Sequence, residues 1–128
     1  MAYTLIPRIT HVDPNDSIEE LRRRISILFD RLMEVNIVTA TATITASCVQ
    51  NVLLCNATTG AITVNLPDAR MHKNHMIIVK KTDASANAVT LDGFSTQTID
   101  GGLTLALAAQ YNFRIIISDG SNWHVVSS

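Results

Sequence analysis

Hydrophobic residues recur at intervals of three and four between residues 17 and 35. They are Ile18, Leu21, Ile25, Leu28, Leu32 and Val35. This spacing is typical of the a/d seam of a coiled coil, because the apolar stripe stays narrow over the whole run. The SIEE sequence at residues 17–20 matches a capping box, in which a serine hydroxyl and a glutamate carboxylate bind free amides of the first helical turn. We therefore expect a coiled-coil helix over residues 17–36 through which the chain oligomerises.

The number of associating helices stays open at this point. Isoleucine at two a positions, Ile18 and Ile25, with leucine at the third, Leu32, is compatible with a dimer or a trimer. The seam covers only about two and a half heptads, fewer than the three or four over which a coiled coil is usually inferred. Other parts of the chain are therefore expected to contribute to assembly. Three further apolar residues lie off the seam, at Ile27, Phe29 and Met33. The alternative is a single amphipathic helix that packs on its own domain.

Residues 1–16 lack sustained periodicity and contain Pro7 and Pro14. We interpret them as an extended N-terminal arm, which is too apolar for a purely disordered tail. The arm is expected to attach the protein to a neighbour through four of its apolar residues. These are Tyr3, Leu5, Ile9 and Val12. An arm folded back on its own domain is the alternative.

The pattern changes after residue 36, where glutamate disappears and threonine, valine, isoleucine and alanine dominate. This is β composition. Alternation and turn residues predict about eight short strands. They cover residues 37–46, 49–55, 62–66, 76–81, 89–91, 103–107, 111–117 and 123–126. Asp-Gly pairs that begin at residues 92, 100 and 119 are hairpin signals. The predicted fold is mainly β, with one N-terminal α-helix and a β-sandwich or barrel-like domain over residues 37–128.

The aromatic residues of the β domain have different predicted environments. The alternation places Tyr111 and Phe113 on one face with Ile115 and Ile117, and this face is expected to point into the core. Trp123 follows a turn and is expected to close the core. The polar connections 68–75, 83–87 and 93–97 are the candidate binding loops. Phe94, in the last of them, is the aromatic residue expected to be exposed.

Length, charge and cysteine content exclude several classes of protein. The chain has 128 residues and a net charge of -1, which gives no electrostatic basis for binding nucleic acid or an anionic membrane. It contains no apolar run of about 18 residues that would span a membrane, and it begins without a signal peptide. Synthesis in the cytoplasm is therefore expected. Cys48 and Cys55 lack metal-site spacing and are expected to be buried or half-buried thiols.

Catalytic motifs are missing from the sequence. It contains no nucleophile elbow, Walker loop or dinucleotide fingerprint, and four of the five acidic residues after Glu34 lie in turn sequences where contacts to the backbone account for them. His72 and His75 are the best metal candidates, because a three-fold axis would multiply each ligand by three, but a solvated connection is the expected role of this HKNH segment. We expect no enzymatic activity, no cofactor and no metal.

Four segments together resemble a β module of bacteriophage tail fibres and related virion proteins. They are NATTGAITVNLP (56–67), MIIVKKTDASANAVTLDG (76–93), TIDG (98–101) and YNFRIIISDGSNWHVV (111–126). The resemblance covers about residues 50–128 of the chain. It implies a non-enzymatic, usually trimeric, assembly or distal module of a virus particle. In the family this module usually ends a much longer chain, whereas about 50 residues precede it here, which favours a short appendage, an adaptor or a decoration protein.

The sequence is thus interpreted as a structural protein of a bacteriophage virion. A homotrimer that forms a short tail fibre or appendage is the preferred form, with other virion proteins of the tail, baseplate or capsid as partners. One alternative is a capsid decoration, or cement, protein on the phage head. An alternative from another class is a carbohydrate-binding adhesion module that binds a glycan on the host surface.

Overall fold

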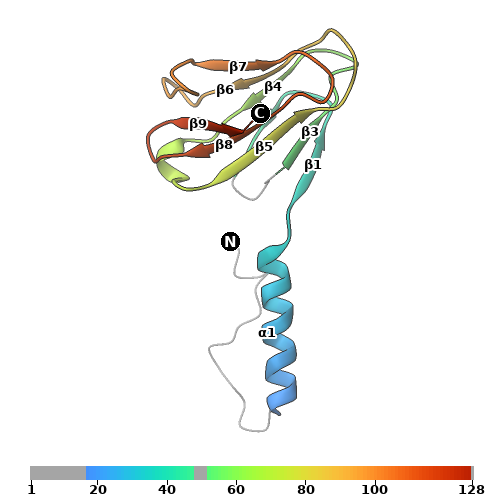
Figure 1. Ribbon diagram of the computed structural model, residues 1–128, viewed down its shortest axis with the longest axis vertical. Helices are drawn as coiled ribbons and strands as arrows, with labels where there is room; N and C mark the ends of the chain where they lie inside the picture. Colours follow the sequence, from blue (N-terminus) through green and yellow to red (C-terminus); the bar gives the residue numbers. More distant parts are fainter. Residues whose placement is uncertain (1–16, 48–51, 128) are drawn as a thin grey trace. The chain divides into compact units, whose positions relative to one another are not determined.

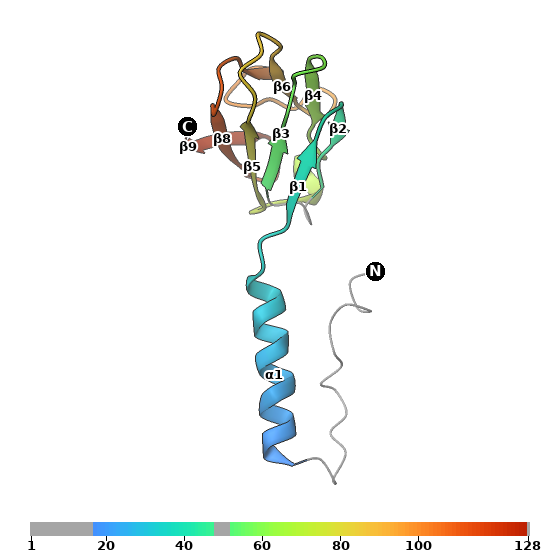
Figure 2. The same ribbon diagram turned by 90° about the vertical axis from the view of Figure 1, so that its right-hand side faces the viewer.

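The computed structural model describes residues 17–47 and 52–127 of the chain (Figures 1 and 2). In these residues one α-helix precedes nine β-strands. The described residues fall into two units, residues 17–34 in one and residues 35–47 and 52–127 in the other. The fold is mainly β, as the composition after residue 36 predicts.

Helix α1 extends over Ile18–Met33. Ser17 is its N-cap, and the Ser17 hydroxyl accepts a hydrogen bond from the amide of Glu20 at 3.1 Å, which satisfies one free donor of the first turn. The carboxylate of Glu20, predicted to complete the capping box, contacts the guanidinium groups of Arg23 at 2.7 Å and Arg24 at 3.2 Å. The hydrogen bond from Arg23 is the main cause that lowers the pKa of Glu20. The predicted start of the helix is therefore confirmed.

The β unit consists of two mixed sheets that pack together in a sandwich-like arrangement. The five-stranded sheet has the order β1-β3-β5-β8-β9 and the four-stranded sheet the order β2-β4-β6-β7. The strands of the first sheet are β1 (Ile37–Ala40), β3 (Val52–Cys55), β5 (Met76–Lys81), β8 (Phe113–Ser118) and β9 (Trp123–Ser127). Those of the second are β2 (Ile44–Thr45), β4 (Ile62–Asn65), β6 (Val89–Asp92) and β7 (Thr104–Leu107).

The first six strands alternate between the two sheets along the chain. Within each sheet they are parallel, since β1 pairs with β3 and β3 with β5, while β2 pairs with β4 and β4 with β6. The chain therefore winds around the core as a short coil. Backbone hydrogen bonds stack its successive corners, from Asn56 to the carbonyl of Ala40 at 2.8 Å and from Thr82 to the carbonyl of Cys55 at 2.9 Å. The last three strands, β7 to β9, are antiparallel to their neighbours.

The prediction of a single strand over residues 37–46 is wrong, because the structure has two strands there, β1 and β2. The chain bends at Thr41 and Ala42, so β1 joins the five-stranded sheet and β2 the four-stranded one. Ala40 and Ala46, on either side of the bend, are both buried in the common core. The two strands share one core although they belong to opposite layers.

The Asp-Gly pairs have three different outcomes. Asp100 and Gly101 have φ values of +48° and +87° and form a two-residue turn between Ile99 and Gly102, whose backbones are paired. The pair that begins at residue 119 lies in the turn between the antiparallel strands β8 and β9. The pair that begins at residue 92 opens a longer connection, residues 93–103, instead of a tight hairpin. Positive φ at both turn positions is tolerated by aspartate and glycine.

The core lies between the two sheets and is almost entirely aliphatic. Trp123 is fully buried there and donates a hydrogen bond from its indole N–H to the carbonyl of Pro67 at 3.2 Å, which confirms its predicted role. The predicted core face of strand β8 is wrong. Ile116 and Ser118 are the buried residues of this strand, while Tyr111 precedes the strand with a φ of +64° and is 59% exposed.

Candidate functional site

The predicted oligomerisation seam lies along helix α1, and its residues differ in exposure. Ile18 is 71% exposed and Ile25 is 37% exposed, while Leu21 and Leu28 are half-buried. The side chain of Leu32 lies outside the described part of the chain. Phe29 is 62% exposed and occupies the e position, directly beside the seam. The described helix therefore presents large apolar side chains to solvent along and beside its seam.

The last predicted seam residue, Val35, does not belong to the helix. The helix ends at Met33, and the C-cap residue Glu34 has extended backbone angles, with φ at −66° and ψ at 135°. Val35 is 60% exposed in the connection that leads to β1. The predicted helix boundary at residue 36 is wrong by one turn, because the extended cap ends the heptad geometry before Val35.

Two predicted features lie outside the described residues. The attachment residues of the arm, Tyr3, Leu5, Ile9 and Val12, belong to residues 1–16, and Cys48 belongs to residues 48–51. Cys55 is a free thiol that is fully buried. Burial raises the pKa of the Cys55 thiol to about 11, so the thiol stays protonated and unreactive at neutral pH.

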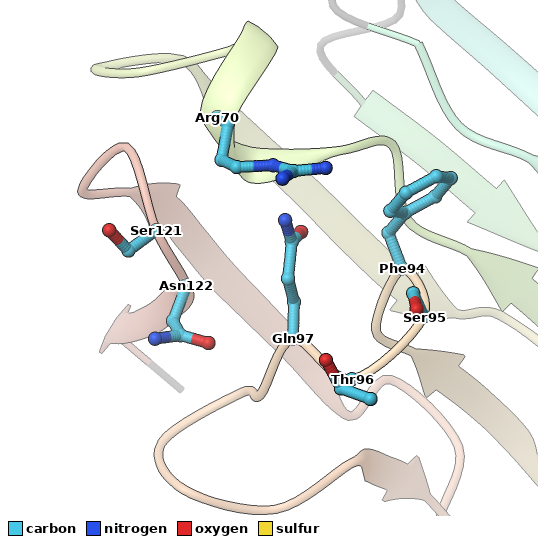
Figure 3. A pocket seen from close by; sticks show the side chains of 7 residues that line it. All are labelled: Arg70, Phe94, Ser95, Thr96, Gln97, Ser121 and Asn122. Atoms are coloured by element: carbon cyan, nitrogen blue, oxygen red, sulfur yellow. The ribbon is translucent and has the colours of Figure 1, made fainter.

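Two of the three candidate binding loops meet in space (Figure 3). A cavity of about 330 Å³ is lined by both loops and by the turn that precedes β9. Its lining residues are Arg70, Phe94, Ser95, Thr96, Gln97, Ser121 and Asn122. Phe94 is 44% exposed at this cavity, as the sequence predicts.

Two polar side chains of this cavity, those of Arg70 and Gln97, bind the same carboxylate, that of Asp68. Arg70 contacts both carboxylate oxygens of Asp68, at 3.0 Å through Nε and at 2.7 Å through Nη2. Gln97 donates to Asp68 at 2.6 Å and accepts the amide of Ala69 at 2.8 Å. The hydrogen bond from Arg70, followed by that from Gln97, holds the pKa of Asp68 well below its usual range. These contacts hold the two loops together, so the cavity offers a ligand an aromatic ring beside an arginine that is already paired.

The third candidate loop, residues 83–87, is part of a buried polar cluster elsewhere. The ammonium of Lys81 lies 2.7 Å from a carboxylate oxygen of Asp83, and both side chains are buried. Asp83 also accepts hydrogen bonds from the amide of Ala57 at 2.7 Å, from the amide of Ser85 at 3.0 Å and from the Ser85 hydroxyl. These bonds hold the pKa of the Asp83 carboxyl well below its usual range, and the bond from Lys81 is the largest cause.

The Lys81–Asp83 cluster was missed at the level of sequence. Alternation along β5 places Ile77, Val79 and Lys81 on the same inward face, and a lysine at a core position is a signal for a buried partner. The partner follows two residues later. The cluster fixes the end of β5 to the corner around Ala57, which makes it a structural element of the loop.

The metal candidates His72 and His75 lie side by side in the structure. The rings of His72 and His75 stack with centroids 5.6 Å apart, and no group of three described His, Cys, Asp or Glu residues has the geometry to hold a metal ion.

His124 lies 2.7 Å from Asp119 at the surface. The amide of Asn122, then His124 and the amide of Ser121, lower the pKa of Asp119 to about 2.

The described helix is not long and apolar enough to cross a membrane.

The seam of α1 and the cavity beside Phe94 are the candidate contact sites that the sequence predictions and the structure share. Comparisons with known proteins add no family, since no family model and no curated protein matches the chain.

Proposed function

We propose that the chain is a non-enzymatic structural protein of a bacteriophage virion that assembles as a homotrimer and forms a short tail fibre or appendage. The observation that carries the assembly is the exposure of apolar side chains along and beside the a/d seam of α1, with Ile18 at 71% and Phe29 at 62%. Exposed groups of this kind are unfavourable in water and are typical of a helix that packs against other helices. The resemblance of residues 56–126 to tail-fibre modules supports the virion assignment.

The helix is too short to stabilise the proposed trimer by itself, so another part of the chain must contribute contacts between copies. Its 16 residues span roughly 24 Å at 1.5 Å per residue. A helix of this length is marginal by itself in water, so the β unit is expected to add contacts to the assembly. The arm at residues 1–16 is the proposed attachment to other proteins of the particle.

The mass of the purified full-length chain in solution tests the assembly. Light scattering is expected to give three times the chain mass of 14.0 kDa. The double variant Ile25→Asp with Leu28→Asp places charge in the seam and is expected to give monomers. A matched control, Ser26→Asp with Ile27→Asp, adds the same charge off the seam and is expected to stay trimeric. A monomeric wild-type chain would overturn the homotrimer.

Particle association tests the virion assignment. The chain is expected to co-purify with phage particles and to be detected in them by mass spectrometry. Deletion of residues 1–14 is expected to leave a folded trimer that no longer joins the particle, whereas retained attachment would place the anchor elsewhere. Labelling of particles with an antibody to the chain separates a tail position from the capsid decoration alternative.

A carbohydrate-binding adhesion module is the second candidate function. The cavity beside Phe94 favours it, because an exposed aromatic ring next to polar groups suits stacking of a sugar. The isolated chain would then bind host-surface glycans on an array, and Phe94→Ala would remove the binding. Absence of glycan binding together with particle association would leave the structural function alone.

A further inference from the structure

The two outer faces of the β unit differ sharply in polarity. Alternation and register identify the outward residues of the four-stranded sheet as Thr45, Thr63, Asn65, Thr90, Asp92, Thr104 and Ala106. This is the polar outer surface that a solvated sheet normally carries. It serves as an internal reference for the opposite side of the same domain.

The outer face of the five-stranded sheet is apolar instead. Its central row crosses four strands in register, with Ile37 on β1, Val52 on β3, Ile78 on β5 and Ile115 on β8. Neighbouring rows on this face add Leu54, Met76, Phe113 and Ile117. Ile37 is 59% exposed and Met76 is 46% exposed, while the others are half-buried. We call this surface the outer isoleucine face.

Polar residues on the outer isoleucine face are few and peripheral. Thr39 lies on the edge strand β1 and His124 on the edge strand β9. The ammonium of Lys80 lies 5.3 Å from the centre of the Tyr111 ring, a cation–π contact that satisfies its charge. Apart from Ser127, which pairs with Ile115 at the edge strand β9, the central row has neither charge nor a hydrogen-bonding side chain, so an apolar partner fits it.

The size of this surface lies within the range of the largest apolar patch of a typical monomer. Its apolar rows cross four strands about 4.8 Å apart, which gives an area on the order of 300 Å², comparable to the largest apolar patch of a typical monomer. It is smaller than the roughly 800 Å² that each partner contributes to a stable interface. The surface is therefore suited to reinforce an assembly that another element already holds together.

The chain connection identifies the partner. Four peptide units separate the last helical residue, Met33, from Ile37 in β1, a span of at most about 14 Å. Strand β1 is the edge strand of the sheet that carries the outer isoleucine face. In a three-fold homotrimer the helices are parallel, so helices that meet at their seams bring the β1 strands of different copies close together, whatever the orientation of each β unit.

We propose that the outer isoleucine face is a second self-association surface, which packs against the β units of the other copies in the homotrimer. This inference rests on the proposed homotrimer and extends it from the helix to the β unit. The short seam and the small sheet face then act together, because they are linked in one chain. Once the helices associate, the sheet faces of the same copies are held at a high effective concentration.

Thiol reactivity in the full-length chain tests this proposal. Ile78→Cys on the central strand β5 and Thr90→Cys on the central strand β6 are matched probes, since both positions are half-buried within one chain. Cys48→Ser removes the other thiol whose reactivity would interfere, while buried Cys55 reports unfolding if it reacts. In the trimer, an aromatic disulfide reagent is expected to modify Ile78→Cys at least about tenfold more slowly than Thr90→Cys, since reactivity follows exposure.

Separation of the copies should remove this protection. With Ile25→Asp and Leu28→Asp added, or at dilutions where light scattering shows monomers, the two thiol rates are expected to agree within about threefold. Equal rates in an intact trimer would overturn the second surface and leave the helical trimer standing. Slow reaction of Ile78→Cys in the monomer would overturn it as well, since a segment of the same chain would then cover the face. If the Thr90→Cys protein, whose helix seam is unaltered, were monomeric in light scattering, the homotrimer itself would be overturned.

Discussion

Replacement of Lys81 by methionine tests the buried polar cluster at the end of β5. The Lys81 side chain is fully buried, with its ammonium 2.7 Å from a carboxylate oxygen of Asp83 and 3.4 Å from the Ser85 hydroxyl. Methionine keeps the apolar stem and removes the charge. The Asp83 carboxylate then stays buried and retains only neutral donors, the amides of Ala57 and Ser85 and the Ser85 hydroxyl.

The expected cost follows from this arrangement. Removal of one partner from a buried ion pair destabilises a protein by about 3 to 5 kcal/mol. The three remaining donors place Lys81→Met at the lower end, at about 3 kcal/mol in the free energy of unfolding. Because a domain of this size loses about 4 to 8 °C per kcal/mol, the midpoint of thermal unfolding should fall by roughly 12 to 24 °C.

Urea unfolding followed by the fluorescence of Trp123 measures this cost, because this buried residue is the only tryptophan of the chain. All variants are compared at one protein concentration, since the proposed assembly would make stability depend on concentration. Lys73→Met is the matched control, and its exposed side chain predicts a change within about 0.5 kcal/mol. The double variant Lys81→Met with Asp83→Asn should recover part of the loss, because it removes the unpaired charge.

The pH dependence supplies a second check of the same reasoning. The pKa of Asp83 is lowered below its ordinary value of 3.8, so its ionised form stabilises the fold above that pH, and the stabilisation is lost as the pH falls through the folded-state value. In Lys81→Met the unpaired carboxylate takes up a proton more readily. The difference between wild type and variant should therefore be largest at neutral pH and should shrink below about pH 4. A loss no larger than that of Lys73→Met would refute the buried pair as a source of stability.

Two further predictions concern turns. Gly93→Ala places a methyl group 2.2 Å from the carbonyl oxygen of Gln97, so it should lower the free energy of unfolding, measured by thermal unfolding, by more than about 2 kcal/mol. Gly60→Ala has nothing within 4 Å of the new methyl group and should lower it by less than about 1 kcal/mol. Similar losses in the two variants would contradict the close approach at Gly93. The lowered pKa of Asp119, about 2, predicts that its contribution is present above its ordinary value of 3.8 and disappears as the pH falls toward 2. Asp119→Asn should therefore flatten the acid part of the stability curve, and an unchanged curve would mean that these loop contacts add no stability.

Features set by short-range chemistry were predictable from the sequence. The start of α1 depends on the Ser17 cap, which acts within one turn. Strand β5 matches its predicted range, residues 76–81, because a compact apolar run is bounded by polar residues on both sides. The burial of Trp123 follows from its size and its place after a turn.

Features set by long-range pairing were not predictable in the same way. Residues 37–46 alternate threonine with small apolar residues, so the two faces differ little and no local signal marks the bend that sends β1 and β2 to different sheets. The parallel coil depends on which strands meet across the sandwich, and this information is absent from any single window. The meeting of residues 68–75 with residues 93–97 is a consequence of the same pairing.

Strand β8 shows why its core face was assigned wrongly. Residues 115–117 are three consecutive isoleucines, so the sequence does not alternate between polar and apolar residues there and does not show which side chains point into the core. Ile116 points inward, and Ile115 and Ile117 belong to the outer isoleucine face. Apolar residues on both faces are typical of strands that are covered on both sides. The ambiguity in the sequence is then itself an indication that the outer face has a partner.

Alanine substitutions at adjacent positions separate the two faces of β8. Ile116 is fully buried, so Ile116→Ala should lower the free energy of unfolding by about 2 to 4 kcal/mol. Ile115→Ala should lower the free energy of unfolding of one chain much less, while it raises the concentration that the proposed trimer needs to stay intact, because the lost contact is repeated in every copy. Sedimentation over a dilution series measures the second effect, with a shift of at least about tenfold expected in the midpoint of dissociation. If Ile115→Ala left that midpoint unchanged, the apolar outer residues of β8 would serve no contact between copies, and the helix seam alone would have to hold the trimer.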